Sequence, residues 1–137
     1  MSGVTKLRLR VPGAGMHEIT REVAELVAEQ VPGDGLCTVF IPHTSASLMI
    51  QENADPSAVS DLERWLDRLV PERDSLYTHT AEGPDDMPAH IKAALTATSI
   101  SIPIVAGRLA LGTWQGIFLW EHRRARGERE ILVHVSR

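Results

Sequence analysis

The stretch LCTVFIPHTSASLMIQENADP, residues 36–56, contains the clearest structural signals of the chain. Two apolar runs, around 36–41 and 47–51, are typical of buried strands. The stretch closes on Asp55 and Pro56, where the aspartate can cap the first free amides of a helix and the proline fits the first helical position. Between the strands stands His43, which can ligate a metal or shuttle a proton near neutral pH, so we regard it as a candidate site residue.

The flanking sequence predicts further elements on the N-terminal side and beyond Pro56. Apolar and charged residues alternate over 4–11, which predicts a half-buried strand. The spacing from Ile19 to Gln30 predicts an amphipathic helix that ends before the turn Val31–Gly35. After Pro56, one apolar stripe predicts a second helix that faces the core, made of Val59, Leu62, Trp65, Leu66 and Leu69.

The C-terminal half continues the mixture of helices and strands. Asp85 or Asp86 is expected to open a short third helix that turns inward its apolar residues Ile91, Ala94 and Leu95. Strands are expected at 99–104, 115–121 and 130–135, and the charged segment 121–130 is interpreted as a hairpin loop between the last two. No internal repeat or linker is visible, so we expect one α+β domain over residues 1–137, mainly antiparallel sheet with about three helices.

Composition limits the classes of partner. A chain of 137 residues with 43% hydrophobic content can build one core of ordinary size. Fourteen Lys and Arg against eighteen Asp and Glu leave no broad basic surface, which argues against a nucleic-acid partner. Cys37 is the single cysteine and lies in an apolar run, so we expect a buried thiol. No apolar block resembles a signal peptide or a membrane span, which favours a cytoplasmic protein without a membrane partner.

Four of the six histidines stand at the boundaries of predicted elements, where side chains can converge on a cleft: His43, His79, His90 and His122. A reactive zinc-type site uses three protein ligands and leaves one position open, and three separated histidines can supply them. No HxxxH or CxxC spacing is present, so the alternative that these are hydrogen-bonded surface groups stays open. His17 lies in an expected loop or helix start, and His134 is an outward polar position of an expected strand, so neither is a strong candidate for chemistry.

Two further segments carry polar groups with more than one interpretation. Asp85 and Asp86 can cap the third helix, and Asp86 can also orient the imidazole of His90 one turn later. In GTWQG, residues 112–116, the glycines permit a bulge or a close approach of ligand to backbone. No GxGxxG or phosphate-binding loop supports a kinase or dehydrogenase, and Ser45 and Ser47 near His43 do not form a G-x-S-x-G elbow.

Taken together, these motifs resemble the YjbQ family, small proteins described as secondary thiamine-phosphate synthases. The resemblance runs from about residue 4 to 135. It is carried by a signature made of Ser99, Ile102, Ile104, Gly107 and 112–115 with Ile117, and by the segments 42–46, 52–56, 82–92 and 121–123. It implies an α+β fold assembled as a homotrimer around a threefold axis. It also implies a cleft that holds a divalent metal, zinc or magnesium, on His43, His79 and His90.

The resemblance further implies a transferase that acts on small phosphorylated substrates. The reaction would join a pyrimidine diphosphate to a thiazole phosphate and release pyrophosphate, with the metal neutralising the leaving group. Glu52, Asp86, Glu121 and His122 are the candidate catalytic residues. The substrate or cofactor would contact Arg108, Thr113, Trp114 and Gln115, and Lys92 or Arg123 could add positive charge. Two alternatives stay open: a metal-assisted hydrolase of a small phosphate ester or amide, and a non-catalytic metabolite-binding trimer.

Overall fold

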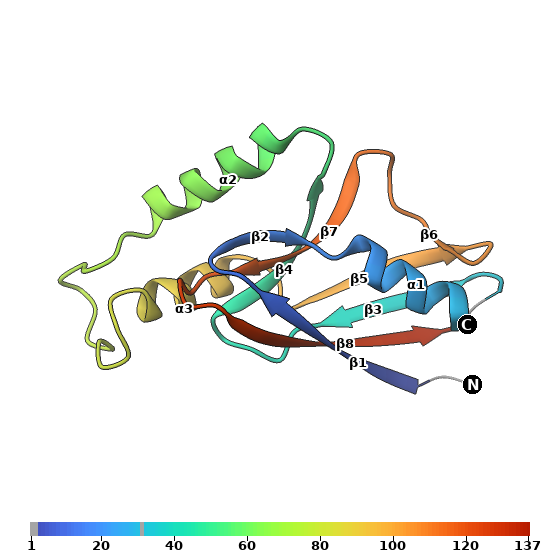
Figure 1. The fold of residues 1–137 in the computed structure, drawn as a ribbon, viewed down its shortest axis with the longest axis horizontal. Helices are drawn as coiled ribbons and strands as arrows, with labels where there is room; N and C mark the ends of the chain where they lie inside the picture. The colour runs from blue at the N-terminus through green and yellow to red at the C-terminus, as the bar shows by residue number, and fades with distance from the viewer. Residues whose placement is uncertain (1–2, 31) are drawn as a thin grey trace.

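The computed structural model describes residues 3–30 and 32–137, which form two antiparallel sheets and three helices (Figure 1). Met1, Ser2 and Val31, the first residue of the predicted turn, lie outside this part of the chain. The five-stranded sheet has the order β1-β8-β3-β5-β6, with β1 Gly3–Val11, β8 Gly127–Ser136, β3 Gly35–Phe40, β5 Ser99–Val105 and β6 Arg108–Leu109. The three-stranded sheet has the order β2-β7-β4, with β2 Gly15–Glu18, β7 Gln115–Glu121 and β4 Ala46–Glu52. The helices are α1 Thr20–Gln30, α2 Pro56–Leu69 and α3 Asp86–Leu95, so the predicted α+β class is confirmed.

The centre of the molecule is β7, which is buried on both faces. Ile117 and Leu119 belong to the main core, which joins the two sheets and α1. Phe118 and Trp120 alternate with them and pack in a second cluster with Leu66 of α2. A strand covered on both sides has no polar face, because successive side chains point in opposite directions. This explains the uninterrupted apolar run Ile117–Trp120 in the sequence.

Helix α2 begins as predicted but does not bury its whole apolar stripe. Asp55 accepts a hydrogen bond from the Ser57 N–H (2.9 Å) at the N-terminus of the helix, so the predicted cap is confirmed. Of the stripe, Leu66 is buried, whereas the side chains of Trp65 and Leu69 are about half exposed. Figure 1 shows why: α2 stands off from the sheets along one side of the molecule. The expectation that this stripe lies in the core of the chain was therefore wrong for Trp65 and Leu69.

Helix α3 packs through a different face from the one predicted. Its buried apolar residues are Pro88, Ala89 and Ala93, while Leu95 is 58% exposed and Ala94 is exposed. The small side chains let α3 approach β4 closely, with which it makes its main contact. Close packing of small residues gives a weaker hydrophobic signal than large apolar ones. The prediction that Ala94 and Leu95 turn inward was therefore wrong.

The charged segment after β7 is not a hairpin. Strand β7 belongs to the three-stranded sheet and β8 to the five-stranded one, so residues 122–126 cross from one sheet to the other. Residues 41–45 make the corresponding crossing between β3 and β4. The two crossing segments meet, since the His122 N–H donates to the Ser45 carbonyl (3.2 Å). The corner that they form places the Thr44 carbonyl and the Arg123 side chain beside α3.

Two short strands escaped prediction. Strand β2, which contains His17, and strand β6, which contains Arg108, are too short to show an alternating pattern. His17 lies on β2, where its Nε2 is 2.8 Å from the carbonyl oxygen of Gly13. In the described part of the chain, no helix combines the length and the apolar character needed to cross a membrane.

Candidate metal centre

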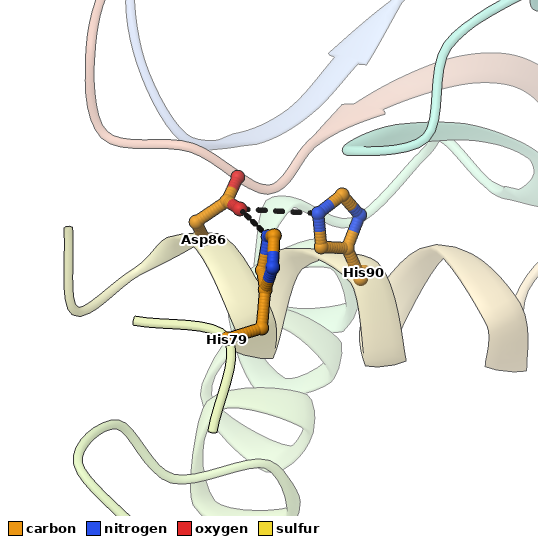
Figure 2. Close-up of side chains that lie close together, drawn as sticks. All are labelled: His79, Asp86 and His90. Atoms are coloured by element: carbon orange, nitrogen blue, oxygen red, sulfur yellow. Dashed lines mark hydrogen bonds and ion pairs between the residues drawn. The ribbon is translucent and has the colours of Figure 1, made fainter. Parts of the chain in front are cut away.

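Three side chains of residue types that commonly bind metals converge at the start of α3. Their ligand atoms, from His79, Asp86 and His90, all lie within 4.8 Å of one another. Figure 2 shows both imidazoles directed at the same carboxylate: Asp86 Oδ2 is 2.8 Å from His79 Nε2 and 3.1 Å from His90 Nε2. We call this group the His-Asp-His cluster. Two imidazoles and one carboxylate are a donor set suited to zinc, with a fourth position left for water or substrate.

Local sequence explains how two of these ligands meet. Asp86 is the first residue of α3 and His90 follows four positions later, so both lie on one face of the helix. The contact between them confirms the prediction that Asp86 can orient His90. His79 arrives from the long connection between α2 and α3, which folds back on the helix (Figure 2). This connection has no periodic pattern, so His79 could be predicted as a candidate ligand from its residue type but its position could not.

Arg123, from the crossing segment after β7, fixes the carboxylate end of the cluster. Its Nη1 donates to Asp86 Oδ1 (2.5 Å) and its Nε to Asp85 Oδ2 (3.1 Å). Asp85 therefore does not cap α3 as predicted, since its carboxylate binds Arg123 and the backbone N–H of Arg124 instead. Burial opposes the ionisation of Asp86, but the hydrogen bond from His79 and the charges of His90 and Arg123 outweigh it and lower its pKa. Asp86 is thus a carboxylate, only 3% exposed.

The hydrogen-bond partners of His90 favour a positive charge at the cluster. On one side, His90 Nδ1 is 3.0 Å from the carbonyl oxygen of Thr44, which can only accept, so Nδ1 carries a proton. On the other side, Nε2 faces the Asp86 carboxylate, which also only accepts. Both contacts are favourable only if His90 is an imidazolium or if its Nε2 lone pair shares a cation with Asp86. The carbonyl that fixes the tautomer is the outer partner expected of a metal-bound histidine.

The cluster opens to solvent on the side of His79. A cavity of about 390 Å³ borders it and is lined by residues of the connection between α2 and α3: Arg73, Asp74, Tyr77, His79, Thr80, Gly83, Pro84 and Met87. The His79 side chain is 49% exposed, and a Glu82 carboxylate oxygen lies 3.4 Å from its Nε2. A small molecule in this cavity can therefore reach the open side of the cluster. Glu82 is a nearby carboxylate that could accept a proton there.

His43 does not join the cluster within the chain. Its Nε2 accepts a hydrogen bond from the backbone N–H of Glu130 on β8 (3.1 Å). Burial and the charge of Arg129 lower the pKa of His43, so the ring is neutral and suited to accept this bond. The three-histidine set expected from the resemblance is therefore not brought together in the described chain, and Asp86 stands in the third place.

Two other candidate catalytic residues lie at the corner where the crossing segments meet. Glu121 is 3% exposed, and both of its oxygens bind Arg129 at 2.6 Å. This carboxylate is engaged in an ion pair and is not free to act as a base. His122 is also buried, with its Nε2 at 2.9 Å from Ser47 Oγ.

The remaining predicted site residues lie elsewhere. In the register of β4 and β7, Glu52 pairs with Gln115 at one end and Ala46 pairs with Glu121 at the other. Six residues of strand separate these ends by about 20 Å. Glu52, Thr113, Trp114 and Gln115 are therefore at the opposite end from Glu121, and Arg108 is on the edge strand β6. One chain does not bring these residues to the His-Asp-His cluster.

The segment containing residues 112–115 has a local structural role. Gln115 Oε1 accepts from the Gly112 N–H (2.8 Å), and the Gln115 N–H donates to the Gly112 carbonyl (3.0 Å). The Gln115 side chain thus closes the turn and is not free to bind a ligand with this oxygen. Trp114 is 64% exposed on the same turn.

Sequence reasoning missed three residues that shape this region: Thr44, Glu82 and Arg129. Thr44 acts through its backbone carbonyl, which any residue would supply, so residue type carried no signal. Arg129 lies in a charged run that is typical of a solvated loop, yet its side chain binds Glu121 and Ser45. Glu82 lies in the segment 82–92 of the family resemblance, and its position three residues after His79 could have indicated that it contacts this histidine.

Comparison with known proteins gives one consistent answer. The family model described as UPF0047 protein YjbQ-like matches residues 5–137. A UPF0047 protein from Synechocystis is 54% identical over 95% of this chain and 88% of its own length. The UPF0047 protein YjbQ from Escherichia coli O157:H7 is 42% identical over 95% of this chain and 94% of its own.

Solved structures agree with the sequence comparison. An uncharacterised YjbQ/UPF0047 protein from Clostridium acetobutylicum superposes with a TM-score of 0.88 at 37% identity, covering 96% of this chain and 99% of that one. A conserved hypothetical protein from Thermus thermophilus gives a TM-score of 0.80 at 36% identity, covering 93% and 97%. The match of the family model over nearly the whole sequence is decisive: the chain belongs to the UPF0047 YjbQ-like family.

Proposed function

We propose that the protein is a metal-dependent enzyme that acts on small phosphorylated metabolites in the cytoplasm. The observation that carries the proposal is the hydrogen bonding of His90, whose two ring nitrogens both face acceptors, an arrangement that a cation shared by His90 and Asp86 would satisfy. The open side of the cluster and the adjoining cavity of about 390 Å³ give a substrate access to it. The imidazole donors favour zinc over magnesium as that cation.

The reaction to test first is thiamine-phosphate synthesis, which the sequence resemblance implies. In this reaction the thiazole nitrogen forms a bond to the pyrimidine methylene carbon, and the bond from that carbon to the diphosphate oxygen breaks. A divalent cation would supply positive charge to the departing pyrophosphate. The chain itself would contribute His79, Asp86 and His90 as ligands, Arg123 to hold Asp86 in place, and Arg73 as a positive group in the cavity wall.

A second candidate is a metal-assisted hydrolase of a small phosphate ester or amide. Glu82 favours it, because a carboxylate 3.4 Å from His79 Nε2 is placed to accept a proton from a water molecule at the open side. A third possibility is that the chain binds a metabolite without transforming it. The three candidates share the His-Asp-His cluster and differ in the products that they predict.

Activity assays with the zinc-loaded protein separate these candidates. Release of pyrophosphate from the pyrimidine diphosphate, dependent on added thiazole phosphate, supports the synthase. Faster release of nitrophenol from a nitrophenyl phosphate supports the hydrolase, and saturable binding without turnover supports the binding protein. We expect the double variant His79→Ala, His90→Ala to lose activity by about 100-fold or more, since loss of outer partners alone costs roughly 10- to 100-fold. His134→Ala on β8 is the matched control, and equal activity in both variants would refute a role for the cluster.

We also propose that the protein assembles as a homotrimer, as the resemblance implies. Support comes from the face of α2 that the chain leaves uncovered, where Trp65 and Leu69 are 54% and 52% exposed. A hollow of about 690 Å³ runs along the same helix. Exposed aromatic and aliphatic side chains on an amphipathic helix are typical of an interface between subunits. Sedimentation of the purified protein as a single chain would contradict this proposal.

A further inference from the structure

A second recess lies between α2 and α3, apart from the His-Asp-His cluster. It consists of two cavities of about 430 and 200 Å³ that share Ala14, Asp67, Lys92 and His122. Neither cavity is lined by His79 or His90. The end of β7 and the following His122 provide one wall, and the other walls come from α2, α3 and the segment before β2.

His122, which lines both cavities, has a buried polar atom without a partner. The residue is 5% exposed, and its Nε2 is 2.9 Å from the hydroxyl of Ser47, which is itself fully buried. The other ring nitrogen, Nδ1, has no hydrogen-bond partner among the described residues. An unsatisfied buried polar atom costs about 1–3 kcal/mol, so a ligand that bonds to Nδ1 recovers this free energy. Burial, with the charges of Lys92 and Arg129, lowers the pKa of His122 to about 3, so the ring is neutral.

Lys92 supplies the recess with a positive charge whose ion pair, with Asp67, is exposed on the Asp67 side. Its side chain is 13% exposed, and its Nζ lies 2.5 Å from a carboxylate oxygen of Asp67. The Asp67 side chain is 69% exposed, and ion pairs with such a partner contribute little to stability. An ammonium has three donors, so Lys92 can bind a ligand in addition to Asp67 or in its place.

The other acidic groups around the recess are already bonded to the protein. Glu63 accepts the backbone N–H of Met16 (2.7 Å), and Asp85 binds Arg123 and the backbone N–H of Arg124. Glu121 is paired with Arg129, and Glu72 is paired with Arg124. Each of these four carboxylates is therefore bonded to a backbone N–H or an arginine of the protein itself. Arg64, which lines the smaller cavity, is exposed and binds Asp61, so Lys92 and His122 are the less exposed groups that remain to recognise a ligand among those described.

We propose that this recess binds a phosphoryl group, with the Lys92 ammonium as its counter-charge and the His122 Nδ1–H as a hydrogen-bond donor. Ser47 Oγ lies 2.9 Å from Nε2, and the proposed site uses the tautomer in which this hydroxyl donates to Nε2 and the proton is on Nδ1. A lysine is a common point-charge ligand of phosphate, and the larger cavity is also lined by Arg124, whose charge is paired with Glu72. The site goes beyond the proposed metal chemistry, because it requires neither His79 nor His90.

The test is a titration of metal-free protein with inorganic phosphate, followed by nitrogen NMR of ¹⁵N-labelled histidines. His122 is assigned with His122→Gln, whose amide oxygen can accept from the Ser47 hydroxyl in place of Nε2 while Nδ1 is lost. We expect a saturable shift of the His122 Nδ1 signal. Lys92→Met should weaken phosphate binding by about tenfold, as expected for loss of one charged hydrogen bond. Lys92→Arg should restore most of the affinity.

Lys6→Met is the matched control, because Lys6 is exposed on β1 and is the only other lysine of the sequence. It should leave phosphate affinity unchanged, as should the double variant His79→Ala, His90→Ala. Thermal unfolding of each variant shows whether it is folded. Absence of a saturable His122 shift, equal weakening by Lys6→Met, or loss of binding in the His79, His90 double variant would each overturn the site. Equal affinity for acetate would refute the assignment to a phosphoryl group.

Discussion

Two histidines that lie at element boundaries have opposite electrostatic roles. His90 bonds to a carbonyl on one side and to a carboxylate on the other, which requires a positive charge on or beside the ring. His122 is buried next to Lys92 and Arg129, and its pKa is lowered to about 3 by burial and these charges. Residue type alone therefore does not tell a candidate metal ligand from a neutral buried ring, because the neighbours of each ring decide.

The neutral state of His122 predicts a loss of stability in acid. The unfolded chain gains a proton on this histidine near its usual pKa of 6.5, whereas the folded chain resists protonation down to about pH 3. Its contribution is therefore complete above pH 6.5 and is lost as the pH falls toward 3. This one group should lower the free energy of unfolding by about 1 kcal/mol between about pH 6 and pH 5.

Urea unfolding at these two pH values measures the effect. His122→Gln should have a smaller pH dependence than the wild type, and the control His134→Gln should retain the wild-type dependence. An identical slope for His122→Gln and wild type would mean that His122 is protonated in the folded protein, contrary to its burial.

At the scale of elements, periodicity predicted most strands and helices but not which sheet each strand joins. The strand signals at 4–11, 36–41, 47–51 and 115–121 correspond to β1, β3, β4 and β7. A hairpin and a crossing between sheets have the same local sequence signal, so the segment 121–130 was misassigned. His43 was misplaced for a related reason, since its partner Glu130 is 87 positions away in the chain. Asp86 and His90 were linked correctly because their relation is local to one helix.

The packing of β7 predicts a strict requirement for glycine at position 116. A Cβ built there would lie 2.6 Å from Glu18 Oε2 and 2.9 Å from Asn53 Cβ, both too close. Glu18 also accepts hydrogen bonds from Thr20 and Asn53, so a displacement of its carboxylate disturbs the start of α1 and the end of β4. Gly116→Ala should lower the free energy of unfolding by about 1–3 kcal/mol, the usual cost of overpacking.

Urea unfolding checks this expectation, with Gly127→Ala in β8 as the control. No atom lies within 4 Å of a Cβ built at Gly127, so that substitution should have little effect. A Gly116→Ala protein as stable as the wild type would show that the Glu18 and Asn53 side chains move aside at no cost in free energy. It would also show that β7 does not depend on this close contact.

At the scale of the whole molecule, the two sheets together build the His-Asp-His cluster. The segment between β3 and β4 supplies the Thr44 carbonyl to His90, and the segment between β7 and β8 supplies Arg123 to Asp86. Both segments cross from one sheet to the other, so the cluster keeps its geometry only while the sheets are packed on each other. The same crossings place His122 at the recess on the other side of α3. Metal binding should therefore report on the fold as well as on the ligands.

The most direct measurement is the metal content of the purified protein, loaded with zinc and freed of excess, for the wild type and four single variants. We expect about one zinc per chain in the wild type, and loss of zinc in His79→Ala, Asp86→Asn and His90→Ala, because three protein ligands hold a reactive zinc. His43→Ala should keep its zinc, since the His43 Nε2 is bonded to Glu130. A wild type that cannot be loaded, or zinc lost in His43→Ala but kept in His79→Ala, would contradict the His-Asp-His cluster as the metal centre.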